Sequence, residues 1–355
     1  MSGTDSQPSR VAVVSASMGG GHDAVADELV RRLRARGCAA HRYDMLELFP
    51  AGVGRGIQWA YARQLEYTPG GWGMLCGLLA WAPMVALVGW LCAVLCGRAM
   101  REAVGDASAV ISTYPLATQV LGRLRARGRL DAPVVTYLTD ISVHPLWVAR
   151  GGDGYLAPHS VTAGQAAARG ATQVRLVEPA VREVFRQPGT GDRSRWGLPA
   201  GRLALVCSGA WGAGDVARIA RDIADTGLAT PVVVCATNTA LRTRLTADGI
   251  GIALGWVDDM AGLMRSCDMV VTNGGGVTTV EAMALGVPVL VYRELPGHGL
   301  TNAMAYDSAG LATWVRDRRE LPGALSDPLP PAPGESIVDS AVLVLAMLDA
   351  AVGVA

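Results

Sequence analysis

A histidine closes the first of two glycine-rich loops, and an imidazole in that place could take a proton from an alcohol. The loop reads SASMGGGH over Ser15–His22 and follows the apolar run Val11–Val14. A helix-like stretch continues from the loop to about Arg36. The alternative interpretation is a histidine that only caps or packs against this helix.

The second glycine-rich loop lies in the opposite half of the chain and reads NGGGVTT over 273–279. The apolar run 269–272 precedes it, and an apolar helical pattern follows it. A glycine loop before a helix directs several N–H groups and the positive helix end to one point, where an anion binds. One such loop in each half predicts two nucleotide-fold domains that face one cleft.

The first loop also fits a dinucleotide-binding fingerprint loosely. Gly19, Gly21 and Ala24 give the spacing GxGxxA, and Asp44 lies about 20 residues further on. An NAD site is therefore an alternative. It leaves His22 and the second loop without a role.

Short apolar runs alternate with helical patterns along the whole chain, which predicts an α/β protein with doubly wound parallel sheets. We predict a first domain over 1–187, a linker over 187–192, a second domain over 193–335 and a C-terminal helix over 336–355. The strands expected in the first domain are 11–15, 39–43, 109–112, 134–138, 154–156 and 174–177, and those in the second are 203–207, 231–235, 252–254, 269–272 and 287–292.

Composition excludes several classes of protein. Half of the residues are hydrophobic and the formal net charge is zero, which argues against disorder and against nucleic acid as a partner. The seven cysteines have no metal-ligand spacing, so we expect free thiols in a reducing compartment. The first ten residues lack the features of a signal peptide. These observations predict a cytoplasmic protein.

One segment is unusually apolar. Residues 72–97 contain no charged residue and include Trp72, Trp81 and Trp90. A single membrane crossing would divide the first domain, and Pro83 would kink or split a helix. We therefore expect a helix or broken hairpin that dips into one leaflet with its tryptophans at the interface. A buried core or dimer helix and a true transmembrane helix are the alternatives.

The first loop resembles the opening loop of the monogalactosyldiacylglycerol synthase family. This family includes processive diacylglycerol glucosyltransferases and is related to the N-acetylglucosaminyltransferase of the lipid II pathway. The resemblance extends over roughly residues 10 to 315, in the family's order. The matching segments are 111–115, 138–147, 255–268 and 271–282.

The resemblance implies a GT-B fold, in which two Rossmann-like domains face a central cleft. It also implies inverting transfer from a UDP-sugar without metal or cofactor, and no DxD triplet is present. His22 would be the general base. Glu281 would hold the ribose, and Val257 would meet the uracil through its backbone. The other positions carried over are Ser208, Gly209, Ala210, Gly275, Gly276 and Thr278 for the diphosphate, His298 and Asn302 for the donor sugar, Asp140 for catalysis, and Gly20, Gly21, His144 and Trp147 for the acceptor.

Several positions depart from the family pattern or have simpler explanations. His298 and Gly299 stand where a glutamine and a glutamate usually grip the sugar, so glucose and galactose cannot be assumed. Asn273 stands where a lysine is common. Asp140 could instead order a loop, and His144 could be structural.

The sequence thus predicts a UDP-sugar glycosyltransferase on the cytoplasmic, inner face of the cell membrane, with a lipid or other amphiphilic acceptor. A transferase for a non-lipid natural product is one alternative. A sugar-nucleotide-binding protein without turnover is the other.

Overall fold

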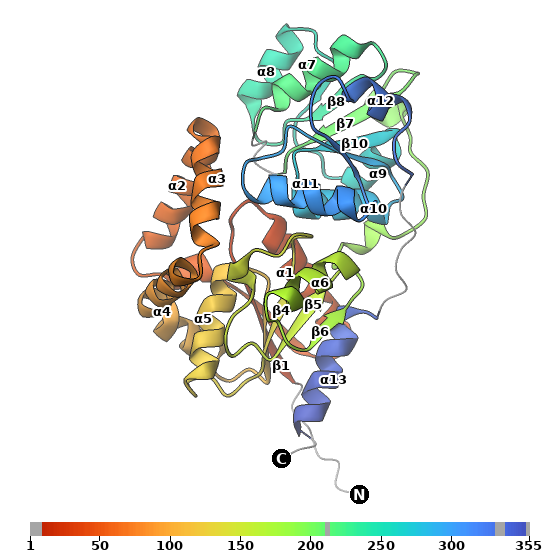
Figure 1. Cartoon of the computed structure of the whole chain (residues 1–355). Coiled ribbons are helices and arrows are strands. Elements are labelled where there is room, and N and C mark those ends of the chain that lie inside the picture. Colours follow the sequence, from red (N-terminus) through yellow and green to blue (C-terminus); the bar gives the residue numbers. More distant parts are fainter. Residues whose placement is uncertain (1–8, 210–213, 331–337, 353–355) are drawn as a thin grey trace, which may run out of the picture.

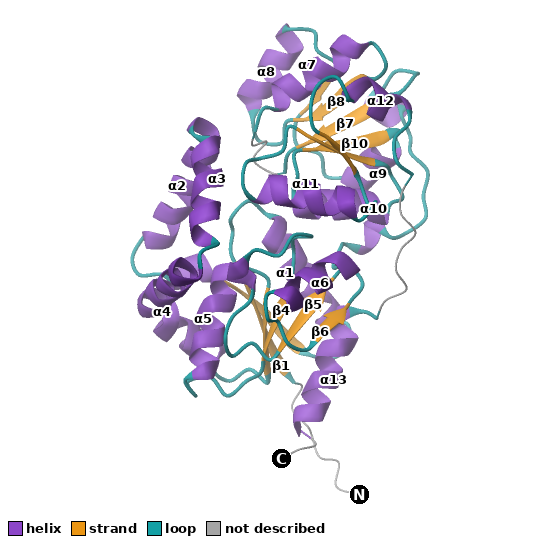
Figure 2. Cartoon of the chain, viewed as in Figure 1, coloured by secondary structure: helices purple, strands orange, loops and turns teal. Residues whose placement is uncertain are grey.

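The computed structural model describes residues 9–209, 214–330 and 338–352. It contains two parallel six-stranded sheets, one in each half of the chain, with helices on both faces of each (Figure 1, Figure 2). Buried side chains lie on both faces of both sheets. The predicted doubly wound architecture is therefore confirmed.

The first sheet has the strand order β2-β1-β3-β4-β5-β6. The order reverses between β1 and β3, so the carboxyl ends of these two strands flank a crevice where such sheets bind ligands. The first glycine loop follows β1 directly. The strands are β1 Arg10–Ser15, β2 Ala39–Asp44, β3 Ala109–Ser112, β4 Val134–Tyr137, β5 Gly154–Ala157 and β6 Val174–Leu176.

The second sheet has the order β12-β11-β10-β7-β8-β9, and its order reverses between β7 and β10. The second glycine loop follows β10. The strands are β7 Leu203–Cys207, β8 Thr230–Val234, β9 Ile252–Leu254, β10 Met269–Thr272, β11 Val289–Tyr292 and β12 Thr313–Val315. β12 was not among the expected strands, because a three-residue edge strand is too short to give a pattern.

The helices connect successive strands and cover both sheets (Figure 2). In the first half they are α1 Gly21–Arg34, α2 Val53–Tyr67, α3 Pro69–Leu79, α4 Ala82–Val104, α5 Pro115–Ala126 and α6 Ser160–Ala168. The second half has α7 Val216–Thr226, α8 Thr239–Ala247, α9 Met260–Arg265, α10 Gly276–Ala284, α11 His298–Ser308, α12 Leu321–Ser326 and α13 Ser340–Val352.

The apolar segment 72–97 forms parts of two helices, α3 and α4. Helix α3 ends at Leu79 and α4 begins at Ala82. Pro83 lies in the first turn of α4, where a missing N–H costs nothing. Helices α2 and α3 stand beside the rest of the molecule in Figure 1. In the described part of the chain, α4 alone is long and apolar enough to cross a membrane by length and composition.

The three tryptophans of this segment have different surroundings. Trp81 and Trp90 are exposed by 61% and 46%, as a membrane-facing role requires. Trp72 instead lines the cleft between the domains and contacts His298. The expectation of three interfacial tryptophans is thus wrong for Trp72, because α3 turns this side chain toward the second domain.

The chain leaves the first domain after β6 and returns to it with α13, and the described ends of these two passages meet at Val177 and Val338. Val177 forms a parallel bridge with Val338, and the Glu178 N–H donates to the Val338 carbonyl. Helix α13 then packs against the first sheet through Ala341 and Val344. It begins at Ser340 rather than 336, since the Asp339 carboxylate accepts from the N–H of Ala341.

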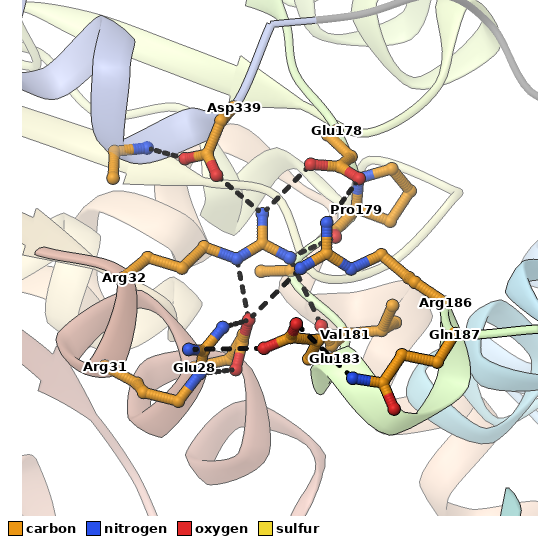
Figure 3. A network of polar contacts seen from close by, with 12 residues as sticks. Glu28, Arg31, Arg32, Glu178, Pro179, Val181, Glu183, Arg186, Gln187 and Asp339 are labelled. Atoms are coloured by element: carbon orange, nitrogen blue, oxygen red, sulfur yellow. Dashed lines mark hydrogen bonds and ion pairs between the residues drawn. The ribbon is translucent and has the colours of Figure 1, made fainter. Parts of the chain in front are cut away.

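A buried arginine stands where these passages meet α1 (Figure 3). Arg32 is 2% exposed, and its Nε donates to the carboxylate of Glu28 at 2.7 Å. Its Nη2 donates to the carbonyls of Pro179 and Val181. Its Nη1 lies 3.6 Å from Glu178 and 3.6 Å from Asp339, one from each passage. One guanidinium thus connects α1, the outgoing passage and the returning one.

The passage out of the first domain differs from the predicted boundary at residue 187. Val181 and Phe185 pack in the hydrophobic core of the second domain. Gly191, in the expected linker, lies so close to Arg265 that a Cβ would meet backbone atoms of that residue. The predicted linker is therefore packed against the second domain.

Candidate active site

The two glycine loops face each other across one cleft of about 1490 Å³ between the domains. Each loop follows a strand at the reversal point of its sheet, so the fold brings the two predicted sites together. A Cβ at Gly276 would lie 3.1 Å from Oδ1 of Asp140, and one at Gly21 would lie 3.3 Å from Val277. Glycine at these positions lets the domains approach closely.

The first loop is held by hydrogen bonds to the helix that it precedes. Gly19 and Gly20 have φ angles of 106° and 87°, which favour glycine. The hydroxyls of Ser15 and Ser17 donate to the Asp23 carboxylate, both at 2.7 Å. These contacts fix the first turn of α1, which carries His22.

The His22 ring is enclosed by protein on one side and lines the cleft on the other. Its Nδ1 lies 3.1 Å from the Thr139 hydroxyl, and its ring makes an edge contact with Tyr114. Burial lowers the pKa of His22 below its ordinary value of 6.5, while Asp140 opposes this. A neutral imidazole that donates from Nδ1 to Thr139 keeps the lone pair of Nε2 for a proton.

Asp140 lines the cleft beside His22 but is not its hydrogen-bond partner among the described residues. Its Oδ1 accepts from Nδ2 of Asn302 in the second domain at 3.4 Å. Asp140 therefore acts on His22 through its charge, and its closest polar contact crosses between the domains.

The second loop presents bare backbone to the cleft. Gly275 caps the N-terminus of α10, and a Cβ there would meet nothing within 4 Å. Gly274 has a φ of 88° and packs directly against the backbone of Gly299. Gly276 and Thr278 also line the cleft. The positive end of α10 therefore faces open space, where an anion would be stabilised.

Two further donor positions follow β7. Gly209 has a φ of 65° and open space where a side chain would be. The buried Ser208 hydroxyl has no hydrogen-bond partner in the described ranges 9–209, 214–330 and 338–352. A buried hydroxyl without a partner costs free energy unless a ligand satisfies it. Ala210, predicted as part of the same diphosphate cradle, lies outside the described residues.

Glu281 and Val257 line the same side of the cleft. Burial raises the pKa of the Glu281 carboxyl to about 7, and the charge of Arg182 opposes that shift. Nη2 of Arg182 is 3.8 Å from Oε1 of Glu281. A carboxylate held in a desolvated site gains much from a pair of hydroxyl donors.

The predicted acceptor residues do not all have free polar groups. Gly20 and Gly21 line the cleft, as does Trp147, which is nevertheless only 2% exposed and packs beneath His22. His144 accepts at Nδ1 from the Leu146 N–H, and its Nε2 lies 3.1 Å from the carbonyl of Cys76. With both nitrogens engaged, His144 holds α3 in place, which is the structural alternative.

Asn302 is predicted to contact the donor sugar. It is completely buried and does not line the cleft. Its Oδ1 accepts from the amide and hydroxyl of Ser142 at 3.1 and 2.6 Å, and its Nδ2 donates to the Gly274 carbonyl at 3.0 Å. Its amide groups are occupied in joining the two domains, and the contact with the donor sugar stays a prediction.

Many residues that line the cleft were not predicted as site residues, and five of them bear on its chemistry. Thr139 follows β4 next to Asp140, and Arg182 lies in the passage between the domains. The other three project from α2 and α3, which carried only a hydrophobicity signal. These three are Tyr61, Trp72 and Cys76. No group of histidine, cysteine and acidic side chains suited to a metal is found within the described ranges.

Comparisons with known proteins agree with this geometry. Residues 96–178 match the family model of monogalactosyldiacylglycerol (MGDG) synthase. A processive diacylglycerol β-glucosyltransferase of Bacillus cereus (strain G9842) is 29% identical over 224 residues, which is 60% of this chain. The chain is similar to the monogalactosyldiacylglycerol synthase family. The matched region spans 57% of that relative's length.

Solved structures give the fold. The crystal structure of Anabaena Alr3699/HepE in complex with UDP has a TM-score of 0.57 at 14% identity and covers 98% of this chain and all of that one. MurG of Acinetobacter baumannii has a TM-score of 0.51 at 16% identity, over 90% of this chain and 89% of MurG. The GT-B fold that the resemblance implies is confirmed.

Proposed function

We propose that this protein is a glycosyltransferase that moves a sugar from a UDP-sugar to the hydroxyl of a lipid-like acceptor. The observation that carries the proposal is the position of His22 directly across one cleft from the glycine-lined N-terminus of α10. A base and an anion site in that arrangement suit an alcohol as nucleophile and a diphosphate as leaving group.

In the proposed complex, the second domain holds the nucleotide. Uracil would meet the backbone at Val257, and the ribose hydroxyls would donate to Glu281. The diphosphate would lie against the amides of Gly275 and Gly276, with the Ser208 hydroxyl as a further donor. This side of the cleft carries the unpartnered hydroxyl and the desolvated carboxylate described above.

The proposed reaction is a single displacement with inversion. Nε2 of His22 takes the acceptor proton as the acceptor oxygen attacks the anomeric carbon. The bond from that carbon to the β-phosphate oxygen breaks, and UDP leaves with the electron pair. The amides and the dipole of α10 would stabilise this charge without a metal ion. Asp140, close to both histidine and loop, would stabilise the imidazolium.

An apolar wall favours a lipid-like acceptor. Leu79, Val88 and Leu116 line the cleft from α3, α4 and α5. The same helices carry exposed apolar side chains outside the cleft, among them Met74, Trp81, Leu87, Trp90, Leu91 and Val94. A helix pair that exposes this many apolar side chains suits attachment to one leaflet. We therefore place the protein at the inner face of the cell membrane.

The proposal is tested by measuring UDP release from purified protein with UDP-sugars and diacylglycerol in vesicles. We expect release only when both substrates are present. Release with a soluble apolar alcohol but not with the lipid would favour the natural-product alternative. UDP-sugar binding without release on any acceptor would leave a binding protein and contradict the enzyme.

Replacement of Glu281 by alanine should weaken UDP binding by about 10- to 100-fold, since a hydrogen bond to a charged group contributes about 1.5–3 kcal/mol. The pH dependence gives a second signature. Burial raises the pKa of the Glu281 carboxyl to about 7 in the protein without ligand, and the ribose would bind the charged form. The affinity for UDP should therefore be constant above pH 7 and fall as the pH drops below it. Calorimetry of Glu281→Gln, which has no charge to titrate, supplies the control. Equal affinity in mutant and parent would place the ribose elsewhere.

Charging the exposed face of α4 should release the protein from membranes. Leu87 and Leu91 are 49% and 48% exposed there. We expect Leu87→Arg with Leu91→Arg to lower partitioning into anionic phospholipid vesicles at least tenfold, since arginine in hydrocarbon costs about 2.5–3.5 kcal/mol. The matched control is Leu228→Arg with Leu329→Arg, on exposed leucines of the second domain. Parent protein that does not co-sediment or co-float with vesicles would contradict membrane attachment.

A further inference from the structure

Helix α3 belongs to the first domain but touches the loop between β11 and α11 of the second, at Pro296 and Gly297. A Cβ at Gly297 would lie 3.5 Å from Cα of Gly73 and 2.8 Å from Sγ of Cys76. A Cβ at Gly73 would lie 3.1 Å from Pro296. Gly297 also has a φ of 83°, which favours glycine. Helix and loop can approach this closely only because both contact points lack side chains.

One side-chain hydrogen bond crosses this contact. Nε1 of Trp72 donates to Nδ1 of His298 at 3.0 Å, and the two rings meet edge to face at 6.2 Å. Tyr61 packs against the other side of the Trp72 ring at 4.7 Å. The indole N–H can only donate, so Nδ1 of His298 must carry the lone pair. In a neutral imidazole the proton then lies on Nε2.

The surroundings favour this neutral form. Burial lowers the pKa of His298 below 6.5; the charge of Asp140 opposes the shift, and His22 and His144 add to it. His298 lines the cleft, and within the described ranges no residue accepts a hydrogen bond from its Nε2. The result is one N–H donor of fixed orientation beside the donor site.

We propose that Trp72 is a positioning residue that fixes the Nε2–H tautomer of His298, and that this N–H donates to a hydroxyl oxygen of the transferred sugar. The donation to the sugar hydroxyl rests on the proposed function. With its Nδ1 engaged by Trp72, His298 offers the cleft a group that only donates. The preferred donor is thus a hexose with a hydroxyl at the contacted carbon, and its deoxy analogue should be disfavoured.

Nitrogen-15 NMR of protein labelled at its five histidines tests the tautomer directly. The His298 signals are assigned by their loss in His298→Gln. We expect a protonated Nε2 and an unprotonated Nδ1 in the parent, and a mixture of tautomers in Trp72→Phe, which keeps the ring but removes the donor. Trp196→Phe, outside the cleft, is the control and should leave the signals unchanged. A protonated Nδ1 in the parent, or unchanged signals in Trp72→Phe, would overturn the assignment.

Ligand affinities test the proposed hydrogen bond from His298 to the sugar. Trp72→Phe should weaken binding of a UDP-hexose by about three- to tenfold, as expected for one neutral hydrogen bond, while affinity for UDP stays constant. His298→Gln, which retains an N–H donor, should recover most of the loss relative to His298→Ala. Equal loss for UDP and UDP-hexose would mean a merely structural contact and overturn the proposal. A parent that binds no UDP-hexose would overturn the proposed function, whereas unchanged NMR signals in Trp72→Phe would overturn only the positioning role.

Discussion

The variant His22→Ala is expected to lose at least about 100-fold in turnover, within the range that general bases contribute. The reason is that Nε2 of His22 is the group we assign to the acceptor proton, and Nδ1 is engaged with Thr139. Affinity for UDP should change little, because the nucleotide site lies on the second domain. Steady-state UDP release and calorimetry on the same preparations separate the two effects.

The pH profile gives this assignment a second readout. Burial lowers the pKa of His22 below 6.5, so the imidazole is neutral and active above that value. As the pH is lowered, the turnover number should therefore begin to fall only below pH 6.5. A base on the surface would already lose activity near 6.5.

The control is His41→Ala, which removes an exposed histidine on β2. It should retain parental turnover and stability. Unchanged turnover in His22→Ala, with or without a loss of UDP affinity, would show that this histidine takes no part in the reaction.

Replacement of Arg32 by methionine should cost about 3–5 kcal/mol of unfolding free energy, because it removes the one buried cation beside the Glu28 carboxylate and leaves only the more exposed Arg31 and Arg186. The side chain of Glu28 is only 1% exposed. Burial alone would raise its pKa, but hydrogen bonds from Arg31 and Arg32 keep it below 4.5. The stabilisation is therefore present above pH 4.5 and is lost as the pH falls below it. Urea unfolding at pH 7 and pH 4 measures both.

Arg31→Met is the matched control, since Arg31 bonds the same carboxylate but is 49% exposed. It should cost no more than about 1 kcal/mol. The double variant Glu28→Gln with Arg32→Met should recover part of the loss, because the stranded charge is gone. A loss below 1 kcal/mol in Arg32→Met would mean that the network of Figure 3 does not hold the domains together.

Local patterns were sufficient to predict most of the fold. Continuous apolar runs identified the described strands apart from β12, since parallel strands are buried on both faces. The glycine loops identified both ends of the cleft, because reversal points of parallel sheets place such loops at one edge. His22 attracted attention because it closes its loop, whereas the role of Glu281 comes from the family resemblance, and both roles stay predictions.

Contacts between distant segments could not be predicted in the same way. Asn302 carried a family resemblance to a sugar contact, but its partners Ser142 and Gly274 come from opposite domains. Trp72 lies in an apolar segment that predicted a position at the membrane interface, yet α3 turns it toward His298. Both outcomes depend on how the domains are placed relative to each other, and hydrophobic periodicity carries no information about that.

The paired chain passages have a consequence for engineering. Because α13 returns to complete a hydrophobic layer of the first domain, the second domain is an insertion within the first. A chimera that exchanges the second domain with that of a relative therefore needs two junctions, one near Val177 and one near Val338. A single junction near residue 187 would strip α13 from the first sheet and expose its apolar face. Exchange of the segment between the two junctions would leave both sheets covered, and any imported second domain would have to match the contacts of Arg32 with residues 178–181.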